Sequence, residues 1–401
     1  MAWRDPLAKR LTVSVLHPGE AIVFQIQEGP CAAGCTYCYE EPVARKIIDG
    51  VVALGRLKPP GSDLNVAQLA AYMTKNADEL GTVMPLAEIA HYFDLLKAAG
   101  INHARLIGSE PTMHPQFEEI LDAAHELGIN LLVYTSGLKM EPLYHSAIAE
   151  LNLHLDYERN AKVVSRSGLT AQFERGELPT PKEMAHVNLL IERGKRVNLR
   201  VNFSDESLWE AGLIFSFYNR LDPRYLSITP LKYSFSTRVA GTDVAYFEPE
   251  SMRRAALRIV GFVDAFKARF PDVPMQTDRP IFPCSFEPAV WKTYVEKGGF
   301  VARCAMEYTV YHKDGLALCP PSRALEVGEQ IEDSKQLVRR IEQLRAKAEG
   351  HFGTPSFPQC EPCQHRLDMT CQGGCGGYKV STPNPALFMP KSLVRPRMAA
   401  R

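Results

Sequence analysis

The sequence has no excess of charge, no long apolar run and no cysteine in its middle. Lysine and arginine number 46, and aspartate and glutamate also number 46. A net charge of zero gives no electrostatic reason to expect binding to nucleic acid or to a membrane surface. No apolar run approaches the length of a membrane span, and the charged first residues, Met1 to Arg10, lead into no signal-peptide core. These absences predict a cytoplasmic protein.

Cysteine is abundant at the two ends of the chain. The first group is Cys31, Cys35 and Cys38. The second group is Cys284, Cys304, Cys319, Cys360, Cys363, Cys371 and Cys375. In a reducing compartment cysteines are more often metal ligands than disulfides. With 401 residues, enough for one large and one smaller domain, the chain is expected to divide into residues 1–250 and 251–401.

Strand and helix patterns alternate through the first domain. The expected strands are Ala21–Gln27, Ala104–Ile107, Leu131–Tyr134, Leu151–Leu155, Val197–Phe203 and Tyr225–Thr229. The expected helices are Pro85–Ala99, Pro115–Leu127 and Pro181–Arg193, each closed by a glycine. This repetition is typical of a parallel α/β barrel or sheet, in which the site lies at the C-terminal ends of the strands.

Two segments do not follow this pattern. Glu40–Met84 is too long for a plain strand-to-helix loop, and we interpret it as an insertion that serves either as extra packing or as a lid or partner surface. The tail after Cys375 carries Lys and Arg but no acidic residue and is expected to be solvated and partly disordered.

The first cysteines follow a strand directly, with the spacing Cys31-x3-Cys35-x2-Cys38. Three thiolates this close suit an iron–sulfur cluster. Three ligands on a four-iron cluster leave one iron open to a small molecule. The alternative is a structural zinc knuckle, which usually needs four ligands in paired spacing.

This spacing, with an aromatic residue before the last cysteine, resembles the signature of the radical S-adenosylmethionine (SAM) superfamily. The resemblance implies a partial (β/α)6 TIM-like barrel and a [4Fe-4S] cluster whose open iron holds the amino and carboxylate groups of SAM. In that family one electron cleaves SAM to a 5′-deoxyadenosyl radical, which abstracts hydrogen from a substrate. The electron would come from a donor such as flavodoxin or ferredoxin.

Later segments add to the resemblance. Gly108-Ser109-Glu110-Pro111 resembles the family's GGEP segment, and Thr135-Ser136-Gly137 resembles its TNG segment. His154 stands where the family has a small residue. Arg166 has the spacing of an arginine that clamps the SAM carboxylate, although a surface arginine is the alternative. The SAM-binding residues that the resemblance implies are Tyr37, Gly108, Ser109, Glu110, Ser136, Arg166 and Asn202.

The second cysteine group resembles the SPASM extension of that superfamily, a smaller cysteine-rich α+β domain with one or two auxiliary iron–sulfur clusters. Cys304 and Cys319 flank an expected hairpin with Asp314-Gly315 as its turn. The resemblance implies a first auxiliary cluster on Cys304, Cys319 and Cys375, with Cys284 as fourth ligand. It implies a second cluster on Cys360, Cys363 and Cys371, which lacks a fourth cysteine and could take His365 or Asp368.

Two alternatives for this group remain. The shorter twitch layout would hold one cluster with Cys304, Cys319, Cys360 and Cys363. A zinc ribbon would use the paired cysteines between Cys360 and Cys375 as a tetrahedral site.

The family resemblance leaves the reaction open. Our leading hypothesis is radical chemistry on a peptide or protein side chain. The alternatives are the same chemistry on a small metabolite and, from another class, a non-catalytic zinc-stabilised binding protein. Pro320-Pro321 directly after Cys319 argues against sulfatase maturation, whose enzymes carry an acidic residue there. The sequence indicates no catalytic residue.

Overall fold

The structure is a computed structural model. It describes residues 15–17, 20–28, 72, 82–155, 171–203, 211–235, 237–238, 245–246, 249–303, 306–319, 328–353 and 360–373. The predictions for Cys31, Cys35, Cys38, Tyr37, Arg166, Cys304, Cys375, the tail and nearly all of 40–84 fall outside these residues.

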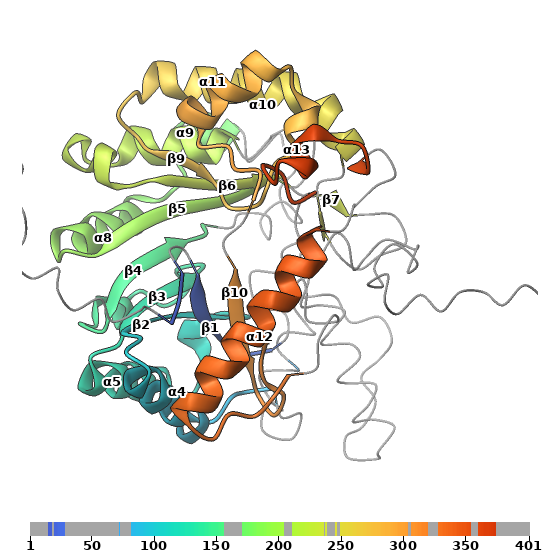
Figure 1. The fold of residues 1–401 in the computed structure, drawn as a ribbon. Helices are drawn as coiled ribbons and strands as arrows, with labels where there is room; N and C mark the ends of the chain where they lie inside the picture. Colours follow the sequence, from blue (N-terminus) through green and yellow to red (C-terminus); the bar gives the residue numbers. More distant parts are fainter. Residues whose placement is uncertain are drawn as a thin grey trace, which may run out of the picture.

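One nine-stranded sheet organises the described chain, in the order β11-β10-β1-β2-β3-β4-β5-β6-β9 (Figure 1). The strands are β1 (Ala21–Gln27), β2 (His103–Gly108), β3 (Asn130–Thr135), β4 (Ile148–Leu153), β5 (Arg196–Phe203), β6 (Leu231–Phe235), β9 (Met275–Thr277), β10 (Glu307–Tyr311) and β11 (Gly315–Leu318). Only β10 and β11 pair antiparallel within it. Strands β1 to β6 are neighbours in chain order, which confirms the predicted partial (β/α)6 barrel. A separate two-stranded sheet pairs β7 (Thr237–Arg238) with β8 (Ala245–Tyr246).

Helices cover one face of the sheet (Figure 1). The described α-helices are α4 (Leu86–Ala98), α5 (Phe117–Leu127), α8 (Pro181–Glu192), α9 (Ala211–Arg220), α10 (Pro249–Arg269), α11 (Pro288–Gly298), α12 (Ser334–Gly353) and the short α13 (Gln364–Leu367). The short 3-10 helices are η1 (Pro111–Met113), η2 (Glu141–Tyr144), η3 (Pro223–Ile228) and η4 (Pro283–Ser285). The three predicted helices are confirmed as α4, α5 and α8, and α5 ends at Gly128 with a left-handed φ of 70°.

Strand β1 is buried along its whole length. Its even-numbered side chains face α4, where the ring of Phe24 lies 5.2 Å from that of Phe93 and 6.1 Å from that of Tyr92. Full burial of one such side chain stabilises the fold by roughly 1.5–3 kcal/mol. The strand that leads into the first cysteine group is therefore anchored in the core.

One predicted strand is wrong. Tyr225–Thr229 lies in and just after η3, which starts because Asp222 accepts a hydrogen bond from the backbone N–H of Arg224 at 2.9 Å and Pro223 supplies a preset φ. The strand begins after Pro230, as β6. An Asp-Pro start is a helix signal, and the apolar residues that follow it do not outweigh it.

The predicted hairpin is confirmed as β10–β11, although its turn is residues 312–314 and Gly315 already opens β11. β10 also pairs in parallel with β1, and β9 pairs with β6. The sheet therefore extends across the boundary predicted at residue 250. Among the described residues no helix is long and apolar enough to cross a membrane.

Helix α12 is tied to the start of β1. Both carboxylate oxygens of Glu20 accept hydrogen bonds from Arg345, at 2.7 and 3.0 Å, and one also accepts from the Tyr308 hydroxyl at 2.8 Å. Burial alone would raise the pKa of Glu20, but these bonds and one from the backbone of His17 lower it. The C-terminal part of the chain is thus joined to the N-terminal strand through a buried ion pair.

Candidate active site

The C-terminal ends of β1 and β2 lie in direct contact. The backbone N–H of Ser109 donates to the carbonyl of Gln27 at 3.1 Å. At Gly108 the φ is +145°, and a Cβ there would lie only 2.6 Å from the same carbonyl oxygen. Only glycine fits this position. The first residue of the GSEP segment thereby holds that segment against the chain that leads, four residues on, to Cys31.

Glu110 joins the end of β2 to the end of β3. Its Oε1 accepts from the Thr112 hydroxyl at 2.8 Å, the Thr135 hydroxyl at 2.6 Å and, more weakly, the Thr112 N–H at 3.3 Å. Its Oε2 accepts from the backbone N–H of Ser136 at 2.7 Å and the Ser136 hydroxyl at 2.5 Å. The side chain is 2% exposed. We call Glu110, Thr112, Thr135 and Ser136 the carboxylate hub.

Five donors saturate this carboxylate, since two carboxylate oxygens offer about four lone-pair sites. Another cation could bind Glu110 only by displacing one of the hydroxyl donors. In the described residues the side chain acts first as a brace that holds two strand ends together. Its predicted contact with the SAM ammonium group remains a prediction.

His114 completes the turn after β2. Its Nδ1 accepts from the backbone N–H of Gln116 at 3.1 Å, so the proton sits on Nε2, which donates to the Met84 carbonyl at 3.0 Å. Burial lowers the pKa of the ring, and the bond to Met84 opposes that shift. His114 is thus a neutral structural residue that ties the turn to the segment before α4.

The predicted SAM contacts therefore separate into three sets. Gly108, Ser109, Glu110 and Ser136 lie together at the mouth formed by β1, β2 and β3. Asn202 lies in β5, in register with Ser234 of β6. Tyr37 and Arg166 are outside the described residues, as are the first three cysteines. His154 follows β4 and donates its backbone N–H to Thr135 at 2.8 Å, which extends the bonded strand ends to a fourth strand.

The face of the sheet opposite the helices carries charge. Arg105 of β2 pairs with Glu307 of β10, and Arg200 of β5 donates to Asp278 at 2.5 Å. The Arg200 guanidinium also lies 4.9 Å from the centre of the Tyr134 ring. Burial raises the pKa of Tyr134 to about 12, and the nearby carboxylate of Glu307 adds to the effect. The phenol is therefore neutral at ordinary pH.

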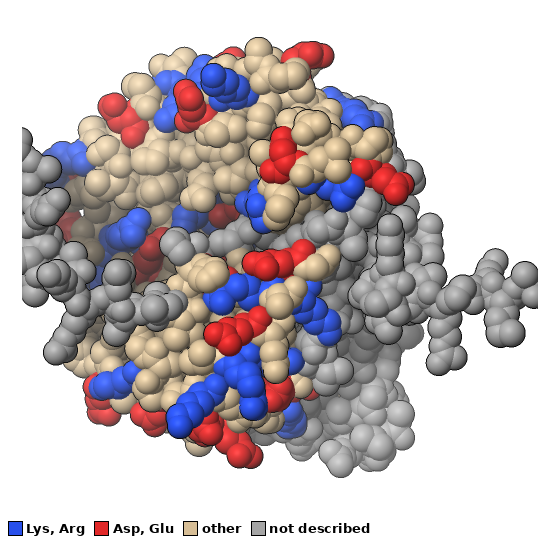
Figure 2. All heavy atoms as spheres, viewed as in Figure 1, with Lys and Arg blue, Asp and Glu red and all other residues tan. Residues whose placement is uncertain are grey.

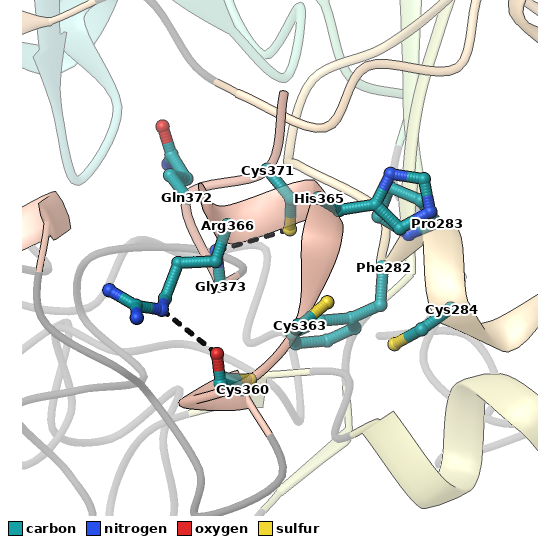
Figure 3. Close-up of a pocket in the computed structure, with 10 residues that line it drawn as sticks. All are labelled: Phe282, Pro283, Cys284, Cys360, Cys363, His365, Arg366, Cys371, Gln372 and Gly373. Carbon is teal, nitrogen blue, oxygen red and sulfur yellow. Dashed lines mark hydrogen bonds between the residues drawn. The ribbon is translucent and has the colours of Figure 1, made fainter. Parts of the chain in front are cut away.

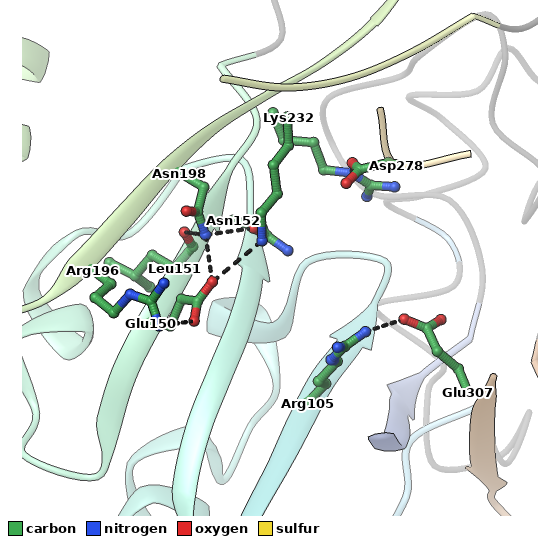
Figure 4. A network of polar contacts seen from close by, with 10 residues as sticks. Arg105, Glu150, Leu151, Asn152, Arg196, Asn198, Lys232, Asp278 and Glu307 are labelled. Atoms are coloured by element: carbon green, nitrogen blue, oxygen red, sulfur yellow. Dashed lines mark hydrogen bonds and ion pairs between the residues drawn. The ribbon is translucent and has the colours of Figure 1, made fainter. Parts of the chain in front are cut away.

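A second group on the same face centres on Glu150 (Figure 4). The carboxylate accepts from Asn198 at 2.7 Å and lies 3.3 Å from Lys232 and 3.5 Å from Arg196. Burial would raise the pKa of Glu150, but the bond from Asn198 and the charge of Lys232 lower it. Together with the two arginine pairs and Tyr134, these residues form what we call the inner-face network.

The inner-face network makes the barrel interior polar. A closed TIM barrel fills this space with branched apolar side chains. Here Figure 2 shows a hollow between the two halves of the molecule in which side chains of both signs are visible. The sequence analysis did not predict this network, although polar and apolar residues alternate in Arg196-Val-Asn-Leu-Arg200 and so place the polar ones on one face of the strand. Such an interior suits a polar, hydrogen-bonding molecule.

A second candidate site is an open pocket of about 360 Å³ in the C-terminal part (Figure 3). Its lining includes four thiols, those of Cys284, Cys360, Cys363 and Cys371. We call this the four-cysteine pocket. Burial raises the pKa of Cys284 and of Cys371, and the neighbouring thiols add to both shifts. His365 also lines the pocket.

Cys319 follows β11 and is not among the residues that line this pocket. The structure places Cys284 beside Cys360, Cys363 and Cys371, the cysteines expected for the second cluster. Its expected grouping with Cys304, Cys319 and Cys375 stays a prediction. The neighbourhood of Cys284 arises because η4 packs beside the 360–373 segment, a contact that spacing along the chain does not reveal.

One family model matches part of the chain. Residues 30–158 match the family model of the Radical SAM superfamily, a range that includes the first cysteine group, the GSEP segment and Ser136. No curated protein matches the chain.

Solved structures share the fold. SuiB of Streptococcus suis bound to S-adenosylmethionine aligns with a TM-score of 0.53 at 14% identity, covering 93% of this chain and 76% of that chain. SuiB bound to precursor peptide SuiA gives 0.52 at 15% identity, with 93% and 75% covered. The native anSMEcpe with bound AdoMet and Cp18Cys peptide gives 0.51 at 12% identity, with 89% of both chains covered. At these identities the likeness concerns the fold alone.

Proposed function

We propose that the chain is a radical SAM enzyme that removes hydrogen from a peptide or protein side chain. The observation that carries this proposal is the mouth of the barrel. There Gly108 and the carboxylate hub hold the ends of β1, β2 and β3 together within the range that matches the superfamily. The same strand ends lead, by sequence, into Cys31.

The donor set that follows β1 in the sequence fits a [4Fe-4S] cluster. Cys31, Cys35 and Cys38 supply three closely spaced thiolates, the ligand type that such clusters take. When bound, such a cluster with SAM on its open iron supplies a carbon radical after transfer of one electron. The protein's own residues then have two tasks, which are to orient SAM and to keep water from the reacting groups.

The carboxylate hub serves the first task. Because Ser136 donates both its N–H and its hydroxyl to Glu110, the turn after β3 is fixed relative to the turn after β2. A ligand that bridges the two turns would meet preorganised backbone groups rather than mobile loops. We include Tyr37, Arg166 and Asn202 in the proposed SAM site on the family resemblance.

The inner-face network supports a polar substrate. Its four cations, Arg105, Arg196, Arg200 and Lys232, face three carboxylates, so a molecule bound at this face meets both signs of charge. Peptide N–H groups can donate to the carboxylates, and peptide carbonyls can accept from the cations. SuiB and anSMEcpe, which share this fold, were both captured with peptides. A small polar metabolite would meet the same groups, and for either substrate the electron would come from a donor such as flavodoxin or ferredoxin.

The test is anaerobic reconstitution with iron and sulfide, followed by SAM and dithionite and an assay for 5′-deoxyadenosine. The wild-type chain should form it, and the triple variant C31A/C35A/C38A should not. Glu118→Gln, on the exposed side of α5, serves as a control that keeps the activity. SAM cleavage by the triple variant would refute the proposal, and zinc in place of iron would indicate a binding protein.

The substrate class needs a separate assay. A short precursor peptide encoded beside the gene, incubated with the reconstituted enzyme and SAM, should change in mass as its side chains lose hydrogen. If peptides remain unmodified while metabolite extracts consume SAM, the small-molecule alternative holds.

A further inference from the structure

The four-cysteine pocket assembles cysteines from two distant parts of the sequence. Cys284 lies in η4, between α10 and α11, whereas Cys360 and Cys363 precede α13 and Cys371 follows it. Figure 3 shows the sulfur atoms of Cys284, Cys363 and Cys371 directed toward the space between the two segments.

Backbone hydrogen bonds hold the two segments in place. Ile281, three residues before Cys284, donates to the Val301 carbonyl at 2.7 Å. The next residue along, Ala302, accepts from the N–H of Gln372 at 3.3 Å. The juxtaposition of Cys284 with Cys371 therefore rests on backbone contacts as well as on side-chain packing.

With Cys375 assigned to the first auxiliary cluster by the family resemblance, Cys360, Cys363 and Cys371 lack a fourth ligand, and Cys284 lies in the same pocket. Of the two non-cysteine candidates, Asp368 does not line the pocket, and its carboxylate accepts from the Thr370 hydroxyl at 2.7 Å. His365 does line it, but its Nδ1 lies 3.3 Å from that same hydroxyl. Cys284 has the softer ligand atom, which iron–sulfur clusters take in preference.

The grouping of the thiols favours a cluster over a zinc ion. A tetrahedral Zn²⁺ with Zn–S bonds of about 2.3 Å brings its sulfurs to about 3.8 Å from one another. Among the residues that the structure describes, no three His, Cys, Asp or Glu side chains are grouped so as to hold one metal ion. Four thiols that line one pocket without forming such a single-ion group suit a polynuclear centre.

We propose that one [4Fe-4S] cluster is held by the four thiols of this pocket, which are Cys284, Cys360, Cys363 and Cys371. The ligand set is then complete without a downstream cysteine and leaves no open iron. The proposal is independent of SAM cleavage, because iron can be counted in a chain that lacks the first three cysteines.

The test uses full-length C31A/C35A/C38A protein, purified without oxygen and analysed for iron, sulfide and zinc. Adding Cys284→Ala should remove about four irons per chain, as many as a [4Fe-4S] cluster contains. Cys360→Ala should remove the same number, and the two changes together should remove no more than either alone. Cys284→Ser, which nearly preserves the volume, should retain the circular dichroism of the parent while its visible absorption shifts.

Cys319→Ala is the matched control. Any iron that it removes should add to the loss from Cys284→Ala, because the two thiols serve different centres. Non-additive iron losses from Cys284→Ala and Cys319→Ala would show that the two thiols bind the same cluster and would overturn the proposal. Full iron in Cys284→Ala beside an iron-poor Cys360→Ala, or stoichiometric zinc in the parent, would overturn the proposal.

Discussion

Replacing Glu110 by glutamine tests whether the carboxylate hub braces the mouth of the barrel. The change preserves volume but puts an NH₂ group in place of one oxygen. On the Oε2 side it would face the Ser136 N–H, a donor that cannot turn. On the Oε1 side it meets mainly the hydroxyls of Thr112 and Thr135, which can rotate to accept. The amide nitrogen should therefore take the place of Oε1.

The cost follows from the bonds that change. Bonds to a charged group contribute about 1.5–3 kcal/mol each and neutral ones about 0.5–1.5 kcal/mol, so each retained bond weakens by roughly 1 kcal/mol. A hydroxyl of Thr135 that turns toward the amide also stays in reach of the Gly137 N–H, which it already accepts at 3.0 Å. With two bonds at Oε2 weakened and the Thr112 N–H left without its acceptor, we expect a destabilisation of about 3 kcal/mol.

Thermal unfolding measures this cost. An unfolding entropy of about 2.1 cal/mol/K per residue over 401 residues makes 3 kcal/mol equivalent to a fall in Tm of about 3–4 °C. Glu118→Gln, an exposed change of the same chemistry in α5, should leave Tm unchanged. Formation of 5′-deoxyadenosine should fall in Glu110→Gln alone. An unchanged Tm for Glu110→Gln would show that the five bonds do not brace the strand ends, and the reasoning would fail.

Two further predictions concern the strands beside this mouth. In urea unfolding, Gly108→Ala should lower the free energy of unfolding by about 3 kcal/mol or more. Strain at a φ that favours glycine costs about 1–3 kcal/mol, and the new Cβ would also meet a backbone oxygen. Gly100→Ala is the control, because open space around its Cβ leaves only the strain. Glu20→Gln should cost about 3 kcal/mol near neutral pH, since Arg345 would be left buried and unpaired. The lowered pKa of Glu20 makes its contribution complete above the ordinary carboxyl value of 4.5 and lost as the pH falls through the folded value, so the variant should lose less stability in acid than wild type. Arg175 also lowers the pKa of Glu177, but that pair is exposed and screened by solvent, so Glu177→Gln should change the acid sensitivity little. Equal acid sensitivity in Glu20→Gln would contradict this assignment.

The sequence predicted the first domain well because its signals are local. The run Ala21–Gln27 reads as a buried strand, and Thr180 with Glu183 forms the capping box that opens α8. The same local reading failed at Tyr225–Thr229, where apolar residues follow an Asp-Pro helix start. Turn chemistry there decides the structure before side-chain hydrophobicity does.

The two sites differ in what the sequence could reveal. The GSEP segment was recognisable as a motif, but its brace to Ser136 depends on which strands are neighbours, and that is a property of the sheet. The fourth cysteine of the C-terminal pocket was beyond spacing arguments, because Cys284 reaches it through the packing of η4 rather than through sequence proximity. Charged residues on alternate positions of β5 were visible, but only the fold shows that Arg196 lies beside Glu150 of β4 and Arg200 beside Asp278.

The position of β1 connects the two halves of the protein. Its residues pair with β2 on one side and with β10 on the other, so removal of the C-terminal part would turn the strand that leads to Cys31 into an edge. The same removal would leave Glu20 without Arg345 and Tyr308. The C-terminal part is therefore a structural support of the mouth, whatever its cysteines hold. A truncation would remove the cysteines and the β10 edge together, so it could not distinguish the loss of a cluster from the loss of sheet pairing. Substitutions of single thiols separate these two effects.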